Sequence, residues 1–273
     1  MKPNKLFIIF ITLIMVVQPT LMVKTGPVKA AGIRSSKPSS TVTSDFQIDL
    51  PLISNKVSAE RAALMALYYS TDGANWFDNS GWNTGSPYCT WEGVTCDGAG
   101  HVTSLILYKN HLEGTIPPAI GDLVYLQSLN LSNDPSCPKG GCQGDAGRIS
   151  GPIPAEIGKL VNLQELNLSY NGLSNIPPEI SNLVNLQTLD LEVNWLNGPI
   201  PPYLGNLVKL EQLILWGNFF SGPIPAELSN LSNLNVLHLA LNPDLECWET
   251  QEALDWALAL SAYYGPDQVC SHN

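Results

Sequence analysis

The sequence predicts an α/β repeat solenoid, in which short parallel strands stack into one curved sheet. One observation is the motif Leu-x-x-Leu-x-Leu-x-x-Asn, which recurs down the 273-residue chain. A second is its spacing, since the intervals between successive copies are 24, 37, 23, 24 and 24 residues. A third is that the six cysteines fall near the ends of this array and in its one long interval. The copies begin at Val102, Leu126, Leu163, Leu186, Leu210 and Leu234.

Each motif predicts one short strand, because residues alternate between the two faces of a strand. Leu166 and Leu168 then point into the core while their neighbours face solvent. The second half of most copies reads Leu-x-Gly-x-Ile-Pro, which predicts polyproline or 3-10 turns on the opposite side. The copy at residues 173–177 lacks the glycine and one residue, so we expect tighter packing there. The complete copies lie at residues 112–117, 149–154, 196–201 and 220–225.

These repeats resemble the plant-type class of leucine-rich repeats, found in receptor-kinase ectodomains, polygalacturonase-inhibiting proteins and some bacterial secreted proteins. The resemblance covers roughly residues 58–270 and includes Cys-x-Trp-x-Gly-Val-x-Cys at residues 89–96, typical of the N-terminal cap. It implies a curved leucine-rich-repeat array with a parallel concave sheet, a 3-10 or polyproline convex side and helical, disulfide-bonded caps. It also implies a ladder of buried asparagines that bond backbone groups where the chain leaves the sheet: Asn110, Asn171, Asn194, Asn218 and Asn242.

Both ends of such an array need caps, because an open end exposes leucine. We expect Ser58 to cap an N-terminal helix that stops at Gly73, and Thr250 to cap a C-terminal helix that Gly265 and Pro266 end. The predicted organisation is a signal peptide at residues 1–31, a Ser-, Thr- and Pro-rich flexible spacer at 32–57, an N-terminal cap at 58–101, six repeats at 102–245 with an insertion at 134–148, and a C-terminal cap at 246–273.

The cysteines form three pairs that are close in sequence. Several connectivities are formally open, but a rigid solenoid keeps its ends farther apart than a disulfide can span, which favours local pairs. Zinc binding is the competing interpretation, but these spacings with no nearby histidine do not supply four ligands. The expected disulfides are Cys89–Cys96, Cys137–Cys142 and Cys247–Cys270.

The N-terminus indicates secretion to the extracellular space or the cell surface. Lys2 and Lys5 precede an apolar stretch at residues 6–17, and small residues around Ala30 offer a cleavage site. The stretch is short for a membrane span, and an uncleaved anchor is the alternative. No second long apolar stretch follows, so no membrane insertion is expected after cleavage.

The charge balance disfavours nucleic acid as a partner. The chain has 13 basic and 24 acidic residues, a formal net charge of −11, whereas binding to phosphates needs clustered lysine and arginine. Removal of residues 1–31 takes away four lysines and no acid, which gives −11 − 4 = −15. The hydrophobic content of 44% is enough for a large core.

The candidate binding residues are those expected to face outward, because packing occupies the inward ones. Aromatic rings beside carboxylates are typical of binding surfaces, since rigid rings bury area at little entropic cost. Scattered, solvated side chains are the alternative interpretation. The candidate ligand-binding residues are Tyr108, Glu165, Tyr170, Asp190, Glu192, Trp195, Trp216, Phe219 and His238.

No catalytic residue, metal or cofactor is predicted. Asp190 and His238 should lie two strands apart, about 10 Å, which is too far for a hydrogen bond. No serine or cysteine has a paired base. A calcium ion held by Glu165, Asp190 and Glu192 is the alternative, but these carboxylates lack a tight ligand loop.

The insertion at residues 134–148 is either a disulfide-stapled binding element or a tolerated loop. Asn-Leu-Ser sequons at Asn130, Asn167 and Asn230 indicate glycosylation only weakly, because the repeat consensus generates them.

The predicted function is that of a secreted recognition module, not an enzyme, that binds a protein, peptide or glycan through its concave face. One alternative is a structural cell-surface or envelope protein without a discrete ligand. Another is an inhibitor of a secreted carbohydrate-active enzyme, although the inhibitors' surface residues do not align convincingly. The sequence does not predict the oligomeric state.

Overall fold

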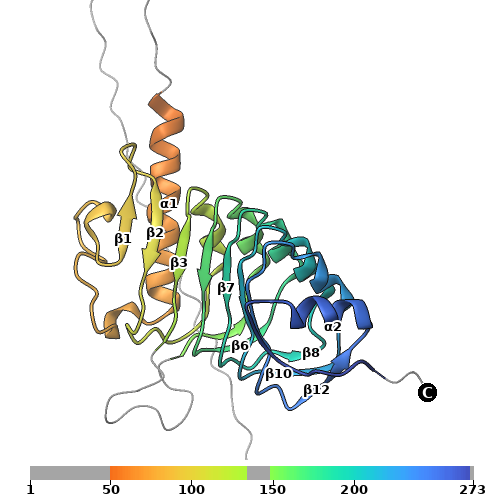
Figure 1. The fold of residues 1–273 in the computed structure, drawn as a ribbon. Helices are drawn as coiled ribbons and strands as arrows, with labels where there is room; N and C mark the ends of the chain where they lie inside the picture. The colour runs from red at the N-terminus through yellow and green to blue at the C-terminus, as the bar shows by residue number, and fades with distance from the viewer. Residues whose placement is uncertain (1–49, 134–147, 271–273) are drawn as a thin grey trace, which may run out of the picture. The chain divides into compact units, whose positions relative to one another are not determined.

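The computed structural model describes residues 50–133 and 148–270, with side chains described from residue 59 onward. An eight-stranded sheet has the order β1-β2-β3-β5-β7-β9-β11-β13, and Figure 1 shows its labelled strands side by side. Neighbouring strands are parallel except β1 and β2. The strands are β1 (Val94–Cys96), β2 (Val102–Ile106), β3 (Ser128–Asn130), β5 (Glu165–Asn167), β7 (Thr188–Asp190), β9 (Gln212–Ile214), β11 (Val236–His238) and β13 (Ala262–Tyr264).

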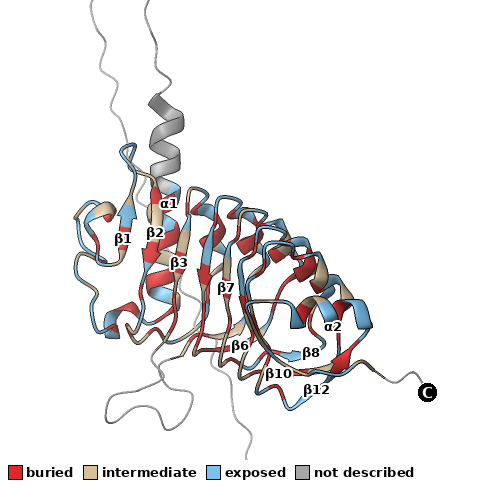
Figure 2. Ribbon diagram, viewed as in Figure 1, coloured by how far each residue is buried: buried red, intermediate tan, exposed pale blue. Residues whose placement is uncertain are grey.

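Leucines at the fourth position of each motif form a continuous row in the core. Leu166 pairs with Leu129 on one side and Leu189 on the other, and all three are fully buried. Their neighbours in the strands, such as Thr188 and Asp190, are only partly buried. Figure 2 shows buried positions alternating with more exposed ones along the strands. The inward direction of these leucines, predicted from the alternation, is confirmed.

Buried asparagines hold the chain where it leaves the sheet. Asn194 donates from Nδ2 to the carbonyl oxygens of Leu168 and Leu191, both at 3.1 Å. Its Oδ1 accepts the N–H of Leu173 at 3.0 Å. These bonds connect neighbouring repeats and satisfy backbone groups that have no strand partner. Asn171, Asn218 and Asn242 bond in the same way, whereas Asn110 exchanges hydrogen bonds with Asp78 of the N-terminal cap.

A 3-10 helix follows each Ile-Pro segment on the convex side, as predicted. Each of these helices has a proline at its N-cap, where the missing N–H costs no hydrogen bond. They are η3 (Pro118–Asp122), η4 (Ala155–Lys159), η5 (Pro178–Asn182), η6 (Pro202–Asn206) and η7 (Ala226–Asn230).

Glycine allows neighbouring 3-10 helices to pack closely. A Cβ atom added at Gly158 in η4 would lie 2.5 Å from the carbonyl oxygen of Glu179 in η5. Ser181 occupies the equivalent position in η5, and η6 packs less closely against η5 than the other neighbouring helices do. The hydroxyl of Tyr203 in η6 donates to the carbonyl of Ile176 at 2.6 Å across this wider space. The tightening predicted at the shortened copy is therefore wrong, because the serine Cβ needs room that glycine does not.

Two smaller parallel sheets lie beyond the asparagines, in addition to the predicted turns. One pairs β4 (Ser150–Pro152) with β6 (Gly172–Asn175). The other joins β8 (Asn197–Gly198), β10 (Phe219–Ile224) and β12 (Asp244–Trp248). The extended segments of successive repeats run side by side, so their backbone groups can pair. β6 and β8 belong to different sheets, and the break between these two sheets falls at the shortened copy.

The N-terminal cap contains helix α1 (Leu50–Ser70) and the short helices η1 (Gly73–Asn75) and η2 (Tyr88–Thr90). The helix begins at Leu50, so the expectation that Ser58 caps it is wrong. Pro51 falls in the first turn, where a proline is compatible with helix and can start it.

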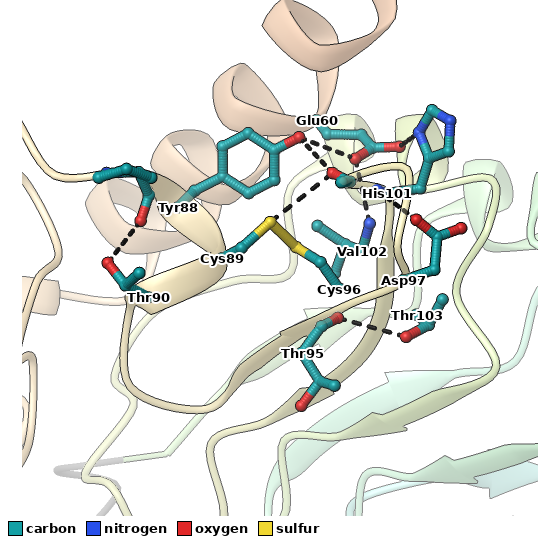
Figure 3. The surroundings of a disulfide bond; sticks show 12 residues. Glu60, Tyr88, Cys89, Thr90, Thr95, Cys96, Asp97, His101, Val102 and Thr103 are labelled. Carbon is teal, nitrogen blue, oxygen red and sulfur yellow. Dashed lines mark hydrogen bonds and ion pairs between the residues drawn. A yellow bond between two sulfur atoms is a disulfide. The ribbon is translucent and has the colours of Figure 1, made fainter.

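A buried carboxylate attaches α1 to the first repeat. Glu60 accepts hydrogen bonds from the N–H of Val102 at 3.1 Å and the hydroxyl of Tyr88 at 3.3 Å, and forms an ion pair with His101 at 3.1 Å. Figure 3 shows these groups beside the Cys89–Cys96 disulfide, whose Cα atoms are 5.5 Å apart. This disulfide was expected and is present.

The C-terminal cap differs from the prediction in one respect. Thr250 caps helix α2 (Gln251–Leu258), its hydroxyl accepting the N–H of Ala253 at 3.2 Å, as predicted. The helix ends at Leu258 and not at Gly265, because the chain turns back to add β13 to the main sheet. The expected Cys247–Cys270 disulfide is present, with Cα atoms 5.1 Å apart. Cys137 and Cys142 lie outside the described residues.

Candidate functional site

A pocket of about 390 Å³ opens on the concave face, which is the outward face of the eight-stranded sheet. Four successive repeats contribute to it, and Tyr108 stands at one end with Asp190 and Glu192 at the other. Four of the nine predicted binding residues line this pocket. The lining residues are Tyr108, Asn130, Ser132, Asn133, Asn167, Ser169, Tyr170, Asp190 and Glu192.

One hydrogen-bonded turn recurs along the floor of this concave pocket. At the ends of β3, β5 and β7, the fifth-position side chain accepts the backbone N–H of the seventh residue. Asn167 accepts from Ser169 at 3.0 Å, and Asp190 accepts from Glu192 at 3.1 Å. The hydroxyl of Ser169 donates to Asn167 as well, at 2.7 Å, which buries the serine. Asn130 and Ser132 form the same pair in the second repeat.

Asp190 carries an incompletely compensated charge. Its second carboxylate oxygen accepts a hydrogen bond from Nδ2 of Asn167 at 3.1 Å. Burial, and to a lesser extent the charge of Glu192, raises the pKa of Asp190 to about 6, although the two N–H donors oppose the shift. Within the described residues, no ion pair joins Asp190 or Glu192 to a basic side chain.

Tyr170 is placed over the pocket by an unusual backbone conformation. Its φ of 57° lies in the left-handed region, as does that of the eighth residue in four other repeats. Burial raises the pKa of Tyr170 to about 12, and its hydrogen bond with Glu192 and that residue's charge add to the rise. The phenol is therefore protonated at neutral pH and acts as a hydrogen-bond donor. The eighth-position residues of the other four repeats with this conformation are Lys109, Val193, Gly217 and Leu241.

Trp216, His238 and Tyr264 form an aromatic row on the same face, over β9, β11 and β13. The ring centroids of Trp216 and His238 are 6.0 Å apart, and those of His238 and Tyr264 are 4.9 Å apart. Burial lowers the pKa of His238, while the charge of Glu192 opposes this shift, and the net effect favours the neutral imidazole. Tyr264 was not among the predicted residues, because its strand follows a helix and carries no repeat motif. The tyrosine pair before Gly265-Pro266 was the available signal.

The other predicted residues neither line the pocket nor join the aromatic row. Glu165 is on β5 beside the pocket and accepts the hydroxyl of Ser128 at 3.0 Å. Trp195 lies over Gly172, with its ring 3.5 Å from a Cβ added there, and Phe219 starts β10 and pairs with Asn197. Neither Trp195 nor Phe219 lies in a strand of the eight-stranded sheet. Each residue directly follows the buried asparagine of its repeat, where the chain has already left the eight-stranded sheet. Both therefore lie in the segments that lead into the smaller sheet of β8, β10 and β12.

In the described ranges, no group of three or more His, Cys, Asp or Glu residues is arranged to hold a metal ion. None of the helices in those ranges is long and apolar enough to cross a membrane.

A parallel sheet with an asparagine ladder, 3-10 helices behind it and disulfide-bonded caps defines a leucine-rich-repeat protein. Three family models match the chain. A leucine-rich-repeat N-terminal domain matches residues 57–97, a leucine-rich repeat matches residues 101–123, and a leucine-rich repeat region matches residues 147–260.

Known proteins with similar sequences are plant receptors and inhibitors. A probable inactive leucine-rich repeat receptor kinase, XIAO of Oryza sativa subsp. japonica, is 48% identical over 58 residues, which are 20% of this chain and 5% of that protein. A polygalacturonase inhibitor of Pyrus communis is 34% identical over 56 residues, 20% of this chain and 17% of the inhibitor. The aligned segments therefore span a small part of these relatives.

Solved ectodomains show the same fold over a longer stretch. The ectodomain of the receptor kinase SOBIR1 from Arabidopsis thaliana has a TM-score of 0.55 and 30% identity, over 69% of this chain and 96% of the ectodomain. The ectodomain of the Arabidopsis receptor kinase HAESA, in complex with a peptide hormone ligand, has a TM-score of 0.62 and 31% identity, over 77% of this chain and 33% of the ectodomain. The chain belongs to the leucine-rich-repeat family and has a plant-type ectodomain fold.

Proposed function

We propose that this protein is an extracellular recognition module that binds a peptide or a segment of a protein across its concave face. The observation that carries the proposal is the pocket of about 390 Å³, which lies on the same sheet as the aromatic row. The strands beneath are fixed by fully buried leucines, so the binding side chains are held in place before a ligand arrives. The similar HAESA ectodomain was solved with a peptide hormone ligand, which supports this class of ligand.

Secretion is part of this proposal. The disulfides in both caps support an oxidising compartment, where such bonds form and persist. We infer that the concave face binds without catalysing a reaction. A purely structural role, the alternative, predicts no selective ligand.

The test uses peptides selected from a displayed random library against the full secreted protein. Trp216 stands in the aromatic row, and Ile106 is exposed at the opposite end of the sheet. Trp216→Ala should weaken the binding of a selected peptide by about 2 kcal/mol or more, as the loss of an aromatic anchor does. Ile106→Ala is the matched control and should weaken binding much less.

Isothermal titration calorimetry measures both affinities, and thermal melts confirm that the variants fold. Selection of no specific peptide, or unchanged affinity for Trp216→Ala, overturns the proposal for this face.

A further inference from the structure

The pocket contains two negative charges that the fold itself does not require. The second and third repeats build the recurring turn from neutral residues, Asn130 with Ser132 and Asn167 with Ser169. The fourth repeat builds it from Asp190 and Glu192, with the same hydrogen bond at nearly the same length. Neutral side chains therefore satisfy this backbone geometry equally well. The turn therefore does not account for the two carboxylates of the fourth repeat.

In the part of the chain that the structure describes, no cationic side chain forms an ion pair with Asp190. Each carboxylate oxygen accepts one hydrogen bond from a neutral N–H group, that of Glu192 or of Asn167. Glu192 beside it is also acidic, and the described residues supply no ion pair to either. Partial burial of an unpaired carboxylate is unfavourable, and a cation placed beside it offsets that cost.

The rest of the pocket also suits a cation. The hydroxyl oxygens of Tyr108 and Tyr170 can accept hydrogen bonds. Aromatic rings attract cations, and the ammonium group of Lys109 already lies 4.9 Å from the centroid of the Tyr108 ring. A carboxylate or phosphate ligand would instead meet two negative charges at one end.

We propose that this pocket takes the ammonium or guanidinium group of a lysine or arginine side chain in the ligand. Asp190 and Glu192 bind the charged group, and the two tyrosines enclose the aliphatic part of the side chain. This inference rests on the proposed function, because it names the residue type that the concave face selects.

The decisive variant is Asp190→Asn combined with Glu192→Ser. It copies the residues of the second and third repeats, so the turn should form and the variant should fold. The control is Glu179→Gln combined with Glu227→Gln, which removes the same charge from exposed positions on the convex helices η5 and η7. Circular dichroism melts check all three proteins.

The probe is an array of random-sequence peptides with equal amounts of basic and acidic residues. Peptides bound by the natural protein should be enriched in lysine and arginine, and replacing the arginine by neutral citrulline should weaken binding at least tenfold. The control variant should retain that difference, and the pocket variant should reduce it to less than twofold.

Two results overturn the inference in different ways. Peptide binding without a basic preference, or a preference that survives in the pocket variant, removes the cation site and leaves the proposed function standing. No selective peptide binding by the natural protein removes both.

Discussion

Asp190 differs in chemistry from its equivalents in the preceding repeats while keeping their geometry. Asn130, Asn167 and Asp190 accept the same backbone hydrogen bond, but only Asp190 brings a charge into the partly buried site. The folded state therefore disfavours ionisation of Asp190. Its protonation state affects the stability of the protein and, in the proposed site, the charge of the ligand that fits.

The stability of the protein should depend on pH through Asp190. Its folded pKa of about 6 lies above its ordinary value of 3.8. Between these values the folded protein binds a proton that the unfolded chain releases, so the free energy of unfolding falls as pH rises from about 4 to about 6. The difference of roughly two pKa units corresponds to at most about 3 kcal/mol.

Asp190→Asn removes the free-energy cost of ionising a partly buried carboxylate in the folded protein. We expect it to raise the free energy of unfolding by about 1–3 kcal/mol at pH 7.5 and to have little effect at pH 4. Denaturant unfolding at both pH values measures the difference, with Glu227→Gln as a control on the convex side. An equal gain at both pH values would contradict the assignment to ionisation.

Close packing between neighbouring convex helices depends on a few positions without a side chain. Gly158 in η4 faces the backbone of η5, whereas Ser181 in η5 coincides with looser packing against η6. How closely neighbouring convex helices pack therefore depends on one residue in each repeat. The leucine row beneath the sheet stays regular.

Gly158→Ala should destabilise the protein by about 1–3 kcal/mol, as overpacking does. Its Cβ would lie 2.5 Å from the carbonyl oxygen of Glu179, so the two helices must separate. Gly85→Ala is the control, because an added Cβ there has no atom within 4 Å. Chemical denaturation compares the two variants, and equal stability would show that η4 and η5 separate without cost.

At the scale of the whole molecule, the caps extend the sheet as well as covering its ends. The N-terminal cap adds the antiparallel strand β1, and the C-terminal cap adds β13. The second addition places Tyr264 beside His238 and lengthens the aromatic row. The concave face is therefore longer than the repeats alone would make it.

Net charge should speed the arrival of a basic ligand. The chain carries a formal net charge of −11, which attracts cations over about 10 Å at moderate ionic strength. The association rate of an arginine-containing peptide should fall severalfold as salt rises from about 20 to about 300 mM, while its dissociation rate changes less. Biolayer interferometry measures both rates, with the citrulline peptide as the comparison. Salt-independent association would contradict electrostatic steering.

The candidate site was predictable only in part. The alternation of the motif located Tyr108, Asp190 and Glu192 on the outward face. It did not identify Ser132 and Ser169 as buried partners of the turn, since their burial follows from hydrogen bonds that the pattern does not encode.

Features that are local to one repeat or one cap could be predicted from the sequence alone. The buried leucines, the 3-10 helices, the Thr250 cap and two local disulfides follow from short spacings, and the asparagine ladder follows from the resemblance to plant-type repeats. Each depends on strand alternation or on residues that are close along the chain.

The way in which successive repeats meet depends on three-dimensional packing, which no single motif encodes. The smaller sheets, the separation of Trp195 from the concave face, the return of β13 and the shared pocket all join residues from different repeats or caps. Their placement depends on the rotation from one repeat to the next, which is set by packing between repeats such as that of Gly158 against Glu179. A repeat motif specifies what each unit buries, and the contacts between units specify which outward side chains come together.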